Sequence, residues 1–87
     1  MYRVVFTKRA EKDKKLLKAA GLEAKAKVLL NRLVENPFQS PPPYEKLLGD
    51  LQGYYSRRIN VQHRLVYSVD TDVQIVVVRS MWTHYER

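Results

Sequence analysis

Residues 54–79 read YYSRRINVQHRLVYSVDTDVQIVVVR and contain three consecutive segments typical of β-strands. The segments Tyr54–Ile59, His63–Val69 and Val73–Arg79 are rich in aromatic and β-branched side chains, which pack well on a pleated sheet. Only three residues separate each segment from the next, which indicates tight turns. We therefore predict a three-stranded antiparallel meander. Its last strand is almost wholly apolar, which predicts that both of its faces are covered.

The N-terminal part of the chain predicts one more strand and a first helix. The run Tyr2–Phe6 is short, β-branched and aromatic, as in a strand. Thr7 is suited to cap the following helix, because its hydroxyl can accept a hydrogen bond from a backbone N–H of the first turn. We expect this helix to extend to Ala20 and to be stopped by Gly21. Its thin apolar stripe consists of Ala10, Leu16, Leu17 and Ala20.

A second helix is predicted over Leu22–Glu35. Its apolar side chains recur at helical spacing, so one face should pack on the sheet. They are Leu22, Ala26, Leu29, Leu30 and Leu33. Pro37 drives the preceding residue out of the helical region and ends the helix, and Pro37–Gly53 is expected to be a loop stiffened by prolines. The predicted order is β-α-α-β-β-β, an α+β domain with two N-terminal helices packed on an antiparallel sheet.

Length and charge restrict the classes of function. With 87 residues, the chain is expected to form a single domain over residues 1–87 without room for a cofactor-binding subdomain. The net charge of +7 favours a polyanionic partner, nucleic acid ahead of an anionic membrane. The absence of cysteine excludes disulfides and thiolate metal sites. We find no signal peptide and no segment long enough to span a bilayer, and we expect a cytoplasmic protein.

Three arginines lie on the first two strands of the meander. The hairpin places Arg64 directly across from Arg58, whereas a slip of one residue would place it across from Arg57. Like charges directly opposite each other destabilise a sheet, so the pairing makes sense if an anion such as a phosphate lies between them. The alternative is a pair of solvated arginines, or an ion pair with Asp50 or Glu45. We expect Arg57 to face elsewhere.

Three other side chains could take part in phosphodiester chemistry. His84 is a candidate general acid, because imidazole changes charge near neutral pH. Glu45, at the end of the proline-stiffened loop, could act as a general base toward a ribose 2′-hydroxyl. Tyr85 could stack on an exposed base. The alternatives are an ordinary surface histidine, a loop carboxylate and a core aromatic. His63 is expected to border the packed face instead.

The two predicted helices carry a broad cationic surface. The excess of one sign favours contact with structural RNA over a merely solvated helix face. The lysines concerned are Lys8, Lys12, Lys14, Lys15, Lys18, Lys25 and Lys27.

Several short motifs resemble one family of bacterial toxins. They are LQGYYSRRI at residues 51–59, HRLVY at 63–67, WTHYE at 82–86, NPF at 36–38 and PYE at 43–45. Together they are similar to the YoeB/Txe toxins of the RelE/ParE superfamily, which belong to type II toxin–antitoxin systems. The resemblance covers residues 36–87 in detail and the N-terminal third in layout. It implies a RelE-like, microbial-ribonuclease-like fold.

The resemblance also implies an activity and a set of site residues. The activity is a ribosome-dependent mRNA endonuclease in which a ribose 2′-hydroxyl attacks the adjacent phosphorus, with no metal or other cofactor. By position, Glu45 corresponds to the general base, Arg64 to the phosphate-binding arginine and His84 to the general acid. Arg58 would assist at the phosphate, and Tyr85 would stack near the substrate or orient it.

The resemblance implies partners as well. They are a YefM- or Phd-like antitoxin with an acidic binding segment, the ribosome and its mRNA, and operator DNA reached only through the antitoxin complex. No membrane is expected, and a homodimer is compatible with the family.

Two departures from the family pattern affect the site. A lysine that a family member carries three residues after the glutamate is Leu48 here, and Lys46 is its nearest replacement as a substrate-binding residue. The interval between Arg79 and His84 is longer than in some members, so the C-terminal segment must take a different path. The competing interpretation is a non-catalytic RNA- or ribosome-binding module that blocks translation by occupancy. A third interpretation is a structural subunit whose basic face binds an acidic partner.

Overall fold

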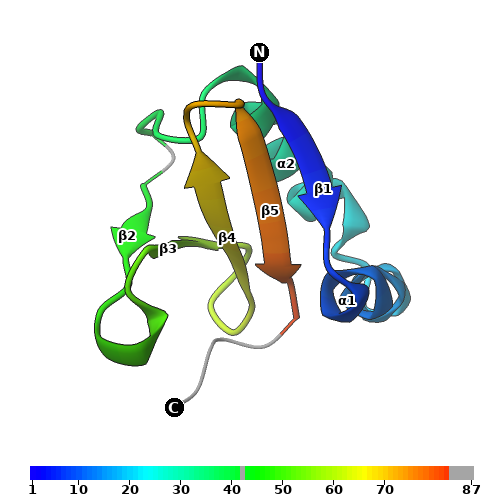
Figure 1. Ribbon diagram of the computed structural model, residues 1–87. Helices are drawn as coiled ribbons and strands as arrows, with labels where there is room; N and C mark the ends of the chain where they lie inside the picture. The colour runs from blue at the N-terminus through cyan, green and yellow to red at the C-terminus, as the bar shows by residue number, and fades with distance from the viewer. Residues whose placement is uncertain (42, 83–87) are drawn as a thin grey trace.

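The computed structural model describes residues 1–41 and 43–82. Two helices pack on a five-stranded mixed sheet, which confirms the predicted α+β class (Figure 1). The elements are β1 (Arg3–Phe6), α1 (Lys8–Ala19), α2 (Glu23–Glu35), β2 (Glu45–Lys46), the 3₁₀ turn η1 (Gly49–Leu51), β3 (Tyr54–Arg58), β4 (Arg64–Asp70) and β5 (Ile75–Ser80).

The strands are ordered β1-β5-β4-β3-β2 across the sheet. β3, β4 and β5 form the predicted antiparallel meander, and Arg58 lies directly opposite Arg64. β1 is added parallel to β5, with Arg3 opposite Ile75, so the sheet is mixed and not wholly antiparallel as predicted. α1 and α2 lie beside the β1 and β5 end of the sheet, which leaves β2 and β3 at the far end (Figure 1).

One predicted loop contains regular structure. The segment Pro37–Gly53 was expected to be irregular, but Glu45 and Lys46 form β2, which pairs with β3. Glu45 lies opposite Ser56, and Lys46 lies opposite Tyr55. A strand of two residues shows no alternation of polar and apolar side chains, so the sequence holds no pattern from which to predict it.

The predicted stripe of α1 is partly wrong. Ala10 and Leu17 are buried, whereas Leu16 and Ala20 are exposed. Asp13 takes the remaining buried position, three residues after Ala10 and four before Leu17, on the same helical face. Its burial requires a hydrogen-bond partner, which the C-terminal segment provides (see below).

The caps and the second helix follow the predictions. The hydroxyl of Thr7 accepts a hydrogen bond from the backbone N–H of Ala10 at 3.1 Å. Gly21 has φ +75°, which favours glycine and suits the break between the helices. In α2, the buried residues are Ala26, Leu29 and Leu33.

The core lies between the helices and one face of the sheet. Its buried residues are Ala10, Leu17, Ala26, Leu29, Leu33, Ile59, Leu65, Tyr67, Val76, Val78 and Met81. β5 corrects one expectation: Val76 and Val78 are buried, but Ile75 and Val77 are only half-buried. The strand is apolar on both faces, yet both helices pack on the face of Val76 and Val78. The opposite face of the sheet, which we call the open face, is not covered by either helix.

Candidate active site

The open face brings together side chains from three strands. Directly opposed residues of antiparallel strands share a face, so Glu45 lies beside Ser56, and Arg58 beside Arg64. Ser56 and Arg58 are two residues apart on β3 and therefore also share this face. A hollow of about 260 Å³ opens here. It is lined by Pro43, Tyr44, Glu45, Ser56, Arg58 and Arg64.

Arg64 lines the hollow and contacts two of its other residues. Its Nη1 atom donates to Oε1 of Glu45 at 3.1 Å and lies 3.3 Å from the Oγ atom of Ser56. The side chain of Arg64 is 19% exposed and that of Glu45 is 61% exposed. The arginine therefore lies at the base of the hollow and the carboxylate at its rim, and both can be reached from solvent. The predicted ion pair with Glu45 is present.

Ser56 belongs to this arrangement and was not predicted. It is only 1% exposed, and its hydroxyl accepts the hydrogen bond from Arg64. A buried hydroxyl needs such a partner, and in return it restricts where the guanidinium can lie. The available signal was its spacing: Ser56 stands two residues before Arg58, so the period of a strand places both on one face.

Two other predicted binding residues, Arg58 and Lys46, lie within the described part of the chain, and only Arg58 reaches the hollow. Arg58 is exposed and lines the same hollow as Arg64. Lys46 lies opposite Tyr55, one residue along β2 from Glu45, so its side chain is on the other side of the strand. The structure therefore does not bring Lys46 to the hollow. Leu48, at the position of the family lysine, is 82% exposed.

A further arginine extends the basic character of the open face. The register of β4 and β5 shifts between Val66 and Tyr67, so that Arg79 is the extra residue of a bulge. Its guanidinium carbon lies 5.1 Å from the ring centroid of Tyr54, in a cation–π contact. Tyr54 shares its face with Ser56, so Arg79 lies on the same side of the sheet as the hollow.

Arg57 faces away from Arg58 and Arg64, as predicted, but it is not a surface charge: it lies on the packed side of the sheet and is 1% exposed. Its Nη2 atom donates to the carbonyl oxygens of Pro37 (2.8 Å) and Gln39 (2.9 Å), and its Nε atom donates to the Tyr67 hydroxyl (3.1 Å). The Tyr67 hydroxyl donates in turn to the Pro37 carbonyl at 2.8 Å. Burial raises the pKa of Tyr67, and the charge of Arg57 offsets part of this rise. This network fixes the loop that leads to Glu45.

The chain that leaves β5 is anchored to α1. The Thr7 hydroxyl donates to the carbonyl of Arg79 at 2.9 Å. The carboxylate of Asp13, which is 3% exposed, accepts from the backbone N–H of Met81 at 2.9 Å. A charged acceptor makes such a bond stronger than a neutral one. The path of the chain is therefore fixed on the packed side as far as Met81.

The next residue, Trp82, is held by His63. The two rings stack with centroids 4.2 Å apart, and Nδ1 of His63 is hydrogen-bonded to the carbonyl of Trp82. His63 thus borders the packed face, as expected. His84 and Tyr85 lie outside the described residues. The position of the candidate acid therefore stays a prediction from the sequence.

Within residues 1–41 and 43–82, no three histidine, aspartate or glutamate side chains cluster as metal ligands would. Over the same ranges, neither helix has the length and apolar character needed to cross a bilayer. Of the predicted site residues, Glu45, Arg58 and Arg64 meet in the hollow.

The chain is similar in sequence to proteins of one toxin family. A family model described as "YoeB-like toxin of bacterial type II toxin-antitoxin system" matches residues 5–85. A toxin YoeB from Synechocystis is 42% identical over 78 residues, which are 88% of this chain and 80% of that protein.

Solved structures of related toxins share the fold. The YoeB/ParE toxin of Agrobacterium tumefaciens superposes with a TM-score of 0.86 at 32% identity, over 95% of this chain and 99% of that one. The Staphylococcus aureus YoeB, solved in a heterotetrameric complex with YefM, gives 0.80 at 34% identity over 98% and 99%. The same S. aureus protein has also been solved as a dimer, with a TM-score of 0.80. The chain belongs to the YoeB toxin family of bacterial type II toxin–antitoxin systems.

Proposed function

We propose that this toxin is a ribosome-dependent mRNA endoribonuclease whose active site is the hollow around Arg64. The observation that carries the proposal is the contact between Arg64 and Glu45 at 3.1 Å, beside Arg58 on the open face. A general base next to two guanidinium groups is the arrangement needed to deprotonate a hydroxyl beside a phosphate. Family membership supports the same activity.

The reaction can be assigned to these residues step by step. Glu45 accepts the proton of a ribose 2′-hydroxyl, and the 2′-oxygen forms a bond to the adjacent phosphorus. The bond between phosphorus and the 5′-oxygen breaks, and His84 donates a proton to that oxygen. Arg64 and Arg58 balance the negative charge that develops on the non-bridging oxygens. Tyr85 stacks near the reacting nucleotide.

The ion pair between Glu45 and Arg64 is suited to this role. With Glu45 more than half exposed, such a pair contributes about 0–1 kcal/mol to folding, so its structural value is small. A phosphate that enters the hollow could take one of the donor positions of Arg64 at little cost to the fold. Ser56 would keep the guanidinium near its place during this exchange.

The proposed partners follow from the family and the charge. A cognate antitoxin of the YefM or Phd type would neutralise this basic chain through an acidic segment, as the complex of the S. aureus relative with YefM suggests. The lysines of α1 and α2 would contact ribosomal RNA, and operator DNA would be reached only through the antitoxin. A homodimer, as solved for the S. aureus relative, is a further candidate assembly.

The test is cleavage mapping on a defined mRNA, with and without translating ribosomes. Glu45→Gln, Arg64→Ala and His84→Gln should each slow cleavage by about a hundredfold or more. Arg32→Ala, which removes an exposed arginine of α2, is the matched control and should cleave as wild type does. Cleavage should require the ribosome and weaken as the salt concentration rises. Equal rates on naked mRNA would contradict the ribosome dependence.

The same experiment separates the competing function. If wild type arrests translation without cutting the mRNA, the chain is a non-catalytic module that acts by occupancy. In that case Glu45→Gln would arrest translation as wild type does.

A further inference from the structure

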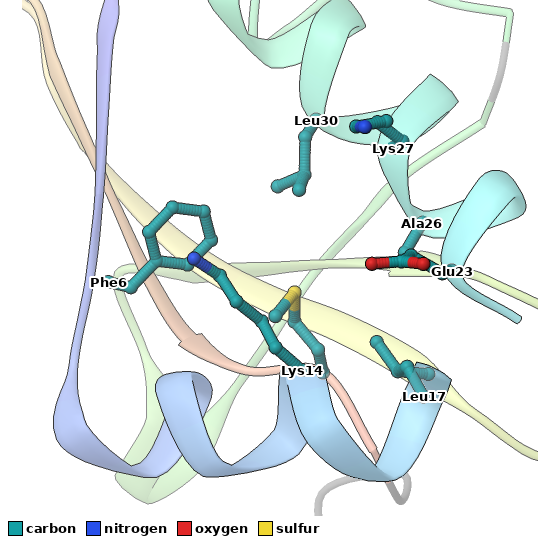
Figure 2. A pocket seen from close by; sticks show the side chains of 8 residues that line it. Phe6, Lys14, Leu17, Glu23, Ala26, Lys27 and Leu30 are labelled. Atoms are coloured by element: carbon teal, nitrogen blue, oxygen red, sulfur yellow. The ribbon is translucent and has the colours of Figure 1, made fainter. Parts of the chain in front are cut away.

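The segment that leaves β5 is held at two successive residues by two different elements. Met81 is 1% exposed, and α1 holds its backbone N–H through Asp13. Its side chain lines a small hollow between α1, α2 and the end of β1, into which apolar side chains of both helices point (Figure 2). Trp82 is held by His63, at the turn between β3 and β4. β4 and β5 are antiparallel, so this turn lies at the same end of the sheet as the end of β5 (Figure 1).

His63 contacts Trp82 in two ways. The imidazole and indole rings are stacked, with an angle of 18° between their planes. In addition, Nδ1 of His63 is hydrogen-bonded to the carbonyl oxygen of Trp82. A carbonyl oxygen can only accept, so Nδ1 carries a proton and donates it. The ring is therefore engaged both through its face and through one of its nitrogens.

The backbone of His63 is itself fixed by the turn. Its N–H donates to Oδ1 of Asn60 at 2.8 Å, and its carbonyl accepts from the N–H of Ile59 at 2.8 Å. Arg64 is the next residue and begins β4. Successive side chains of an extended chain point to opposite sides, so Arg64 reaches the hollow whereas His63 reaches Trp82. Two adjacent residues thus connect the phosphate-binding site with the C-terminal segment.

We propose that His63 is a positioning residue for the cleavage reaction. By holding Trp82, it sets where the following segment, which carries the candidate acid His84, meets the phosphate bound by Arg64. This inference rests on the nuclease function proposed above. His84 follows Trp82 by two residues, which span at most about 7 Å, so a displacement of Trp82 is passed on with little slack. A misplacement of about 1 Å can slow an enzyme about a hundredfold.

His63 is the other histidine of the chain, but its contacts do not suit the role of the acid. It lies on the side of the strand opposite to Arg64. Its Nδ1 proton is donated to a backbone carbonyl, and one face of its ring is covered by the indole of Trp82. We therefore expect His63 to act on the reaction through Trp82 and not on the RNA.

The first test is spectroscopic and uses the free protein. Trp82 is the only tryptophan of the chain, so its fluorescence reports the stack directly. His63→Ala should shift the emission to longer wavelength, because the indole loses the ring that covers one of its faces. Gln62→Ala, at an exposed position of the same turn, is the matched control and should leave the emission unchanged. An unchanged spectrum in His63→Ala would show that the stack is absent in solution and would overturn the proposal.

The second test is single-turnover cleavage of a defined mRNA on translating ribosomes. His63→Ala should lower the rate constant at saturating toxin about tenfold or more. The toxin concentration that gives half of this rate should stay within about twofold of wild type, because binding to the ribosome is not changed. Gln62→Ala should cleave as wild type does. If His63→Ala instead raised the half-saturating concentration and left the rate constant unchanged, His63 would act in binding and the proposal would be wrong.

A double-variant cycle shows whether the two rings act through each other. Trp82→Ala should slow cleavage by a similar factor, and it leaves the turn and Arg64 unaltered, so it keeps the test decisive if His63→Ala does not fold. The variant with both changes should be little slower than the slower single variant. Losses that multiply would mean that His63 and Trp82 act independently, which would overturn the proposal.

The positioning role and the nuclease function fail in different ways. A wild-type protein that cleaves no mRNA on ribosomes would refute the nuclease function and, with it, the role of His63. A wild-type protein that cleaves, together with a His63→Ala rate constant within about twofold of it, would refute the positioning role alone.

Discussion

Replacing Arg57 by methionine should destabilise the fold more than any change of an exposed arginine. Methionine fills part of the volume but cannot donate hydrogen bonds. The Pro37 carbonyl would keep its bond from Tyr67, whereas the Gln39 carbonyl and the oxygen of Tyr67 would each lose the donor that Arg57 provides. A hydrogen bond that involves a charged group contributes about 1.5–3 kcal/mol, so the loss of these two bonds suggests roughly 3–6 kcal/mol.

That loss is large for a domain of this size. At about 0.05–0.15 kcal/mol per residue, 87 residues give roughly 4–13 kcal/mol in total. The melting temperature should fall by at least about 10 °C, and the urea midpoint should fall with an unchanged slope. Circular dichroism during thermal and urea unfolding measures both. Arg58→Met, at the exposed neighbouring position, is the control and should change stability by less than about 0.5 kcal/mol. An Arg57→Met protein within 1 kcal/mol of wild type, roughly the value of a single ordinary hydrogen bond, would refute this account of the network.

Three further outcomes are expected. Asp13→Ala should lower the free energy of unfolding in urea by about 1–3 kcal/mol, because the buried N–H of Met81 loses its acceptor. Asp13→Asn keeps an oxygen there and should lower it less; equal losses would show that the acceptor is unimportant. The folded-state pKa of Tyr67 is raised, so its contribution to stability is complete below about pH 10 and is lost as the pH rises further. Above that pH, the unfolding free energy should therefore decrease less steeply with pH in Tyr67→Phe than in wild type. Ser56→Ala should slow mRNA cleavage several-fold, whereas Ser56→Thr, which keeps the hydroxyl, should cleave at nearly the wild-type rate. If Ser56→Thr cleaves as slowly as Ser56→Ala, the hydroxyl has no role in cleavage and Ser56 is a purely structural residue.

The sequence could predict the face on which each arginine lies. Side chains alternate along a strand, so adjacent Arg57 and Arg58 must point to opposite sides, and the length of the turn sets Arg58 against Arg64. Periodicity likewise gave both helices and the meander. These features depend on neighbours in sequence, where local patterns are informative.

The sequence could not predict contacts between distant segments. The pairing of Glu45 with Ser56 depends on an edge strand too short to have a pattern. Asp13 looks like an ordinary polar residue of a charged helix, and only the path of the chain after β5 explains its burial. Lys46 was predicted as a binding residue because it lies next to Glu45 in sequence. Successive side chains of a strand point to opposite faces, so the side chain of Lys46 lies on the other side of the sheet.

The parallel pairing of β1 with β5 has a consequence for synthesis of the protein. β1 is made first among the five strands, yet its partner in the sheet is made last. Until β5 leaves the ribosome, the helices that follow β1 have no complete sheet on which to pack, since Val76 and Val78 belong to the core. Such long-range contacts form late, after the entropy of closing the chain has been overcome. The nascent chain should therefore stay open, and accessible to a partner already present in the cell, until β5 has left the ribosome.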